Sequence, residues 1–150
     1  SKFGYPVFNA DHEVSKLYKN NRKVFVKLNK KLPRHIRAYP INKKQITEAI
    51  LSNKTNLKKI INIVHEEVRK KMKSFLKKNK NKKIVILDIP LLLENNIYNK
   101  KDILVFVDSK KKEIQKRLTK RKNFNRKLFN KFNKIQLNVK YKKKKITFHN

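Results

Sequence analysis

Residues 85–96 read VILDIPLLLENN, and the order of residue types in this stretch decides the fold. An apolar run ends at Asp88, Pro90 follows, and three leucines then lead to Glu94. A strand that only packs in a hydrophobic core does not need an acid at its end. Because proline cannot continue a strand ladder, the pattern predicts a strand, an acid at its tip, a rigid turn and a hydrophobic anchor. Glu94 is then expected at the rim of a sheet.

Working outward, continuous apolar runs predict the other strands. Residues 84–87 (IVIL) and 102–108 (DILVFVD) are typical of strands that are buried on both faces. Residues 5–11 (YPVFNAD) predict a third strand, and residues 146–149 (ITFH) a final one. Two such strands with a helix-length connection between them indicate a parallel α/β sheet.

Helical periodicity fills most of the chain between these runs. Residues 12–32 predict one helix or two short ones, and residues 41–51 a further short helix. The clearest helix carries an apolar stripe of Leu57, Ile60, Ile61, Val64, Val68, Met72 and Phe75, with Asn53 or Thr55 as its N-cap. Ser109 is expected to cap the next helix. Proline-bracketed residues 33–40 and residues 78–83 predict a loop and a turn.

Composition limits the possible functions. The net charge is +33 over 150 residues, which suits a polyanion-binding surface but is also expected from Lys- and Asn-rich codon usage. There is no cysteine, which excludes disulfides and cysteine-bound zinc. No apolar run reaches about 18 residues, so the chain is predicted to be cytoplasmic. Gly4 is the single glycine, which excludes a glycine-rich loop within these residues.

Three acids follow predicted strands: Asp11, Asp88 and Asp108. In a parallel sheet, ligands bind beyond the carboxyl ends of the strands, where an acid can accept a proton from a hydroxyl or hold magnesium. The competing interpretation is that each acid caps the following helix, and Asp108 fits it best because Ser109 and a helix come next.

Three basic residues also suggest a site. Arg117 and Arg121 are one helical turn apart and can face the same anion, although a solvated basic face explains them equally simply. His65 lies at the edge of the apolar stripe, where a histidine is more often structural.

Taken in order, these segments resemble the dephospho-CoA kinase family, P-loop kinases that phosphorylate the ribose 3′-hydroxyl of dephospho-coenzyme A with ATP. The stretch LDIPLLLEN (87–95) is similar to the family's specific D-x-P-L-L-x-E motif. Weaker matches are FNADHEV (8–14), the helical stretch 41–72, and ILVFVDSKKKEIQKRLTKR (103–121), with Gln136 and the lysines from 142 resembling the end of the lid.

The resemblance implies a three-layer P-loop kinase-like parallel sheet with a helical insert and a lid, in one kinase domain over residues 1–150. Residues 12–76 resemble the insert that receives coenzyme A, and residues 117–142 the lid. Asp11 resembles the general base; His65, Asp88 and Glu94 are implied substrate-binding residues; Arg117, Arg121 and Lys142 are implied to bind ATP from the lid.

Three positions depart from the family pattern. Asn9 replaces the first acid of the family's "DAD" segment, Glu66 replaces a proline, and Lys142 replaces an arginine, which keeps charge but loses bidentate geometry.

The family's opening strand, GxxxxGK[ST] loop and helix have no counterpart here. We therefore expect a fragment without the central first strand, the P-loop and the extreme C-terminus, and expect this chain alone to be inactive. The resemblance implies ATP and Mg²⁺, whose P-loop ligands are absent from these residues, and no metal ligand is assigned within the chain.

Two alternatives remain at this stage. Another P-loop nucleotide kinase is disfavoured by the D-x-P-L-L-x-E match and by the long helical insert. A small basic RNA-binding protein could stack bases on Phe124, Phe129 and Phe132, but their helical spacing favours a core-facing role. The expected partners are therefore dephospho-CoA and ATP, with neither a membrane nor a nucleic acid.

Overall fold

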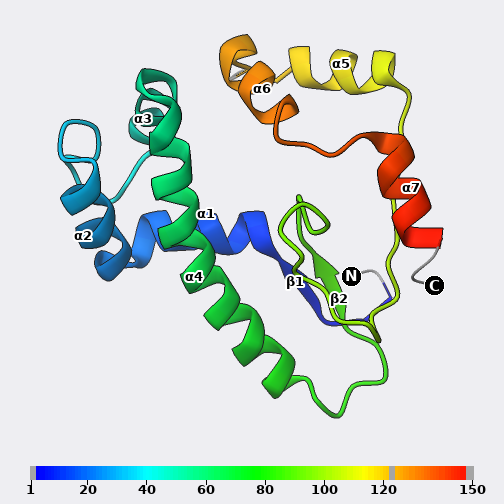
Figure 1. Cartoon of the computed structure of the whole chain (residues 1–150). Coiled ribbons are helices and arrows are strands. Elements are labelled where there is room, and N and C mark those ends of the chain that lie inside the picture. Colours follow the sequence, from blue (N-terminus) through cyan, green and yellow to red (C-terminus); the bar gives the residue numbers. More distant parts are fainter. Residues whose placement is uncertain (1–2, 122–123, 148–150) are drawn as a thin grey trace. The chain divides into compact units, whose positions relative to one another are not determined.

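The computed structural model describes residues 3–121 and 124–147, which form two compact units, Ser1–Pro90 and Leu91–Asn150. The first unit has strands β1 (Val7–Asn9) and β2 (Ile86–Asp88) and four helices. The helices are α1 (Ala10–Asn20), α2 (Arg22–Lys31), α3 (Lys43–Ser52) and α4 (Lys54–Lys78). Helices α1, α2 and α3 all pack against the long helix α4 (Figure 1). Residues 12–32 therefore form two helices.

Asparagine side chains start each of these four helices. Asn9, Asn21, Asn42 and Asn53 are the N-caps, and each side chain accepts a hydrogen bond from a backbone N–H two or three residues later. An asparagine at this position satisfies a donor that the helix itself cannot pair, which contributes about 1 kcal/mol. The Asn53 cap is confirmed. These asparagines thus mark where the four helices of the first unit begin.

The core of this unit lies where the helices meet α4. Leu17, Val24, Leu28 and Ile36 have less than 2% of their surface exposed, and Ile60 and Val64 of α4 are also buried. The predicted stripe of α4 is therefore its inward face. Asn56 is the one buried polar residue that is identified, and its Nδ2 donates to the Ala49 carbonyl at 2.9 Å, which joins α4 to α3.

Strands β1 and β2 are parallel and in register, with Val7 opposite Ile86 and Asn9 opposite Asp88. The parallel α/β class is confirmed. The prediction that residues 84–87 are buried on both faces is wrong, because Ile84 and Ile86 are 51% and 39% exposed. In the described part of the chain each strand has only one neighbouring strand, and the side chains of Ile84 and Ile86 are only partly covered.

The second unit contains α5 (Lys111–Thr119), α6 (Arg126–Asn133) and α7 (Val139–Thr147). The predicted strand 102–108 is not formed among the described residues: residues 103–108 have no regular secondary structure, and Ile103, Val105 and Val107 are more than 80% exposed whereas Leu104 is buried. The alternation typical of a strand is present, but this segment does not join β1 and β2 in the sheet identified among the described residues.

Two smaller predictions for this unit also fail. Ser109 does not cap α5, whose N-cap is Lys110 without a side-chain hydrogen bond; the Ser109 N–H donates to Asp108 Oδ1 at 2.8 Å instead. Residues 146–147 of the predicted last strand belong to α7, and residues 148–149 lie outside the described residues. The described helices include none that is long and apolar enough to cross a membrane.

Leu28→Ala tests the core at the meeting of α2 and α4. Because Leu28 is fully buried, its truncation is expected to lower the free energy of unfolding by about 2–5 kcal/mol. The measurement is urea denaturation followed by circular dichroism. Val26→Ala on the same helix is the control, since Val26 is 55% exposed and its loss is expected to cost less than about 0.5 kcal/mol. Equal losses would contradict this packing.

Candidate functional site

The carboxyl ends of β1 and β2 are tied together by side chains. Asn9 Nδ2 donates to Asp88 Oδ2 at 2.7 Å, and Asn9 Oδ1 accepts from the His12 backbone N–H at 2.8 Å. One amide therefore caps α1 and holds the acid at the end of β2. The sequence showed Asn9 only as a lost acid; its function as a bridge depends on the register of two strands that are distant in sequence.

Asp11 lies in the first turn of α1, two residues beyond this bridge, and its side chain is exposed. Within residues 3–121 and 124–147 its carboxylate has no hydrogen-bond or ion-pair partner. The positive end of the helix dipole favours a carboxylate at this position. Asp11 and Asp88 therefore share the carboxyl edge of the sheet, as predicted, with Asp88 held in place and Asp11 accessible. Asp108, by contrast, ends no strand.

His65 is half-buried on α4. Burial, assisted by the nearby positive charge of Arg69, lowers the pKa of His65 below its usual value, so the imidazole is neutral at pH 7. Glu66, which follows it, forms an ion pair with Lys70 at 2.7 Å. No described contact joins His65 to the edge of the sheet.

Glu94 and Lys142 meet within the second unit. Lys142 Nζ is 2.6 Å from Glu94 Oε1, which also accepts the Leu137 backbone N–H at 3.0 Å. Burial alone would raise the pKa of Glu94, but the hydrogen bonds from Lys142, from its own backbone and from Leu137 prevail, so the pKa lies below its usual value. Sequence reasoning assigned these residues to different ligands and missed their pairing.

Arg117 lies in the last turn of α5, whereas Arg121 lies beyond the helix end at Thr119. The backbone continues for a further turn because the Arg121 N–H donates to the Leu118 carbonyl at 3.1 Å. Both arginine side chains are exposed and available to an anion.

Two of the aromatic residues after Arg121, Phe124 and Phe129, pack on each other. The Phe124 and Phe129 ring centroids are 6.0 Å apart, and both rings and Phe132 are partly buried. Stacking of bases needs open ring faces, so this arrangement favours the core-facing interpretation over an RNA platform.

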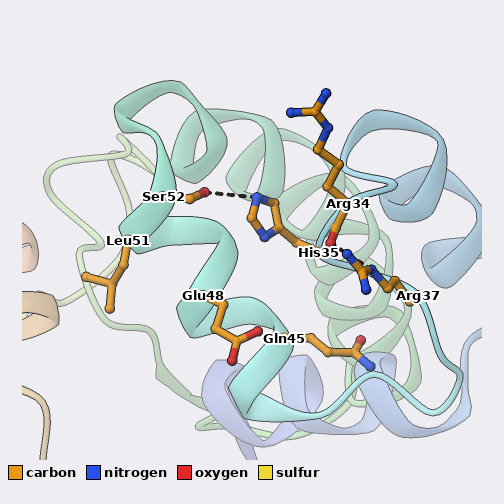
Figure 2. A pocket seen from close by; sticks show the side chains of 7 residues that line it. All are labelled: Arg34, His35, Arg37, Gln45, Glu48, Leu51 and Ser52. Atoms are coloured by element: carbon orange, nitrogen blue, oxygen red, sulfur yellow. Dashed lines mark hydrogen bonds between the residues drawn. The ribbon is translucent and has the colours of Figure 1, made fainter.

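A cleft of about 730 Å³ that the sequence did not indicate lies between α3 and the loop before it (Figure 2). It is lined by Arg34, His35, Arg37, Gln45, Glu48, Leu51 and Ser52. Ser52 Oγ donates to the Ala49 carbonyl at 2.9 Å, so it must accept its 3.0 Å bond from His35 Nε2. His35 is thereby fixed as a wall of the cleft. The one available signal was the run of basic residues within the proline-bracketed loop.

Comparisons with known proteins all point to the same family. The family model for dephospho-CoA kinase matches residues 1–148. The dephospho-CoA kinase of Wolbachia pipientis wMel is 30% identical over 98% of this chain and 76% of its own length. The enzyme from Wolbachia of Brugia malayi is also 30% identical, and that of Bartonella henselae 29% identical over 97% of this chain and 75% of its own length.

Asn9→Asp tests the bridge at the edge of the sheet. The variant keeps the cap on α1 but sets a carboxylate against Asp88, so we expect a loss of about 1 kcal/mol in unfolding free energy at pH 7 in metal-free buffer. Repulsion raises the pKa of the carboxyl pair above that of a free aspartate, so the loss should shrink as the pH falls toward about 4, because one acid of the folded protein is protonated there.

The control is the double variant N9D/D88N, which restores the hydrogen bond with donor and acceptor exchanged and should recover the stability. Thermal or urea unfolding at several pH values measures the effect. An N9D protein as stable as the unmodified one at pH 7 would show that the bridge is unimportant.

Proposed function

The chain belongs to the dephospho-CoA kinase family, and we propose that Asp11 is the general base of its reaction. The family transfers a phosphoryl group from ATP to the ribose 3′-hydroxyl of dephospho-CoA, which completes coenzyme A biosynthesis. The observation that carries the proposal is the exposed carboxylate of Asp11 at the shared carboxyl edge of β1 and β2, where no described residue binds it.

The chemistry required of Asp11 is limited. It accepts the proton of the ribose 3′-hydroxyl while the oxygen bonds to the γ-phosphorus of ATP and the bond to the bridging oxygen of ADP breaks. Phosphoryl transfer depends chiefly on orientation and on neutralising charge, so one positioned carboxylate is sufficient for the acceptor side. Its place in the first turn of a capped helix sets its backbone two residues beyond the end of β1.

Asp88 is proposed to contact the substrate beside Asp11. The Asn9 amide occupies Asp88 Oδ2 and leaves Oδ1 to accept a hydrogen bond from a sugar hydroxyl. Asn9 also avoids the repulsion that a third carboxylate would add to this edge. The asparagine in the "DAD" segment is therefore compatible with a working acceptor site.

His65, Arg117 and Arg121 keep the functions that the family resemblance implies. Residues 12–76 supply the helical layer for the coenzyme A moiety, with neutral His65 as a hydrogen-bonding residue. Residues 117–142 form the lid of a three-layer kinase fold in a single kinase domain, and Arg117 and Arg121 neutralise ATP phosphates with their exposed guanidinium groups.

Magnesium is proposed to enter with the nucleotide. The described residues contain no group of three or more acids or histidines that could hold a metal ion. Phosphate oxygens would supply most of the ligands of the ion, with Asp88 adding a carboxylate. Bound there, Mg²⁺ would neutralise phosphate charge. Neither a nucleic acid nor a membrane is a proposed partner, and a cytoplasmic location stays a prediction.

Asp11→Asn tests the proposed base in the natural polypeptide that contains these residues. The amide cannot accept the hydroxyl proton, so kcat is expected to fall by about 100-fold or more while KM for dephospho-CoA changes little. A coupled ADP-release assay measures both constants.

The matched control is Asp102→Asn, because an amide oxygen at that position can still accept the Asn99 N–H that Asp102 binds at 2.8 Å. This variant is expected to keep kcat within about twofold, given the small effect of most substitutions away from a site. A D11N enzyme with unchanged kcat would remove Asp11 from the mechanism.

Arg121→Met tests the lid. Loss of a charge-assisted hydrogen bond to phosphate is expected to raise KM for ATP by about tenfold or more, with a smaller change in KM for dephospho-CoA. Arg22→Met, an exposed arginine on α2, is the control and should leave KM for ATP unchanged. Equal KM values for ATP in the two variants would show that Arg121 does not bind the nucleotide.

A further inference from the structure

The pairing of Glu94 with Lys142 differs from every other ion pair identified in the molecule. The two side chains are only 7% and 15% exposed, whereas Lys143 and Asp108, paired at 2.6 Å in the same unit, are 56% and 47% exposed. Exposed pairs contribute little because water and salt screen them, whereas breaking a covered pair leaves a charge without compensation. Breaking the Glu94–Lys142 pair is therefore expected to affect the structure more than breaking the Lys143–Asp108 pair.

Glu94 lies in a turn that is closed by hydrogen bonds. Its turn is closed by backbone hydrogen bonds from Asn95 to Leu91 at 3.1 Å and from Ile97 to Leu92 at 3.1 Å. The Asn95 side chain also donates to the Leu91 carbonyl at 2.9 Å. The carboxylate therefore projects from a part of the chain that is internally fixed.

The groups that Glu94 holds belong to the start of α7. Leu137 precedes the helix and Lys142 lies in its second turn, so one carboxylate oxygen fixes both the entry into α7 and a side chain on it. We call the Glu94 carboxylate, the Leu137 N–H and the Lys142 ammonium the α7 anchor.

We propose that Glu94 is a positioning residue that acts through Lys142, and that the α7 anchor fixes the end of the lid-like region. An ammonium that is largely covered and 2.6 Å from a carboxylate is not free to neutralise a phosphate. Lys142 therefore serves the reaction by holding α7, and the exposed arginines of the lid take the phosphate charge. The kinetic test of this inference rests on the proposed function.

The test compares E94Q, K142M and the double variant E94Q/K142M in the natural polypeptide that contains these residues. Each single variant leaves one covered charge without a partner, so each should raise KM for ATP by about tenfold. The double variant removes both charges while nearly keeping the side-chain volumes, and it should return KM for ATP to within about threefold of the unmodified enzyme.

Two kinetic outcomes would overturn the proposal. If the double variant keeps the high KM of K142M, Lys142 acts on the nucleotide directly. If the single variants leave KM for ATP unchanged, the anchor does not position the lid. Lys112→Met, an exposed lysine on α5, controls for the loss of one positive charge and should not change KM for ATP.

Amide hydrogen exchange gives a second readout that needs no turnover. Removing the acceptor with E94A should speed exchange of the Leu137 amide, while the amides of α4 exchange as before. An unchanged Leu137 rate would contradict the anchor even in an active enzyme. If the unmodified protein fails to phosphorylate dephospho-CoA, the proposed function fails while the exchange experiment still decides the anchor.

Discussion

The hydrogen bond from Asn9 to Asp88 connects the parts of the first unit on which the site depends. It joins the ends of the two parallel strands, and the same side chain starts α1, which carries Asp11. The backbone register sets Asn9 opposite Asp88, and the side-chain hydrogen bond fixes how the Asp88 carboxylate is oriented. Two of the three polar residues at this edge, Asp11 and Asp88, are like charges. A neutral amide is suited to this position because it both donates and accepts.

Local sequence patterns predicted the features that depend on local interactions. The stripe on α4 and its Asn53 cap were predictable, because side chains three and four residues apart and a cap two residues away act within one helix. The placement of Asp11 and Asp88 at one edge followed from the rule that parallel strands end together. Their order along the chain also carried the family resemblance, which the match over residues 1–148 confirms.

Features that depend on distant partners could not be predicted in this way. Residues 102–108 have the apolar alternation of a strand, yet a strand exists only when another segment pairs with its backbone. The Glu94–Lys142 pair links two ordinary charged residues, and nothing in either local sequence indicates the other. The cleft beside α3 combines a loop with one helix face, so its lining becomes visible only when both are placed (Figure 2).

Two places are candidates for binding the nucleotide-bearing substrate. One is the carboxyl edge of β1 and β2 with Asp11, and the other is the cleft lined by Arg34 and His35. Titration of the isotope-labelled natural polypeptide with dephospho-CoA, followed by NMR chemical shifts, separates them directly. We expect the largest shifts at the Asn9 side-chain amide and at the backbone amides of Asp11 and His12. Shifts confined to Arg34, Arg37 and Gln45 would contradict the assignment of the substrate hydroxyl to Asp11.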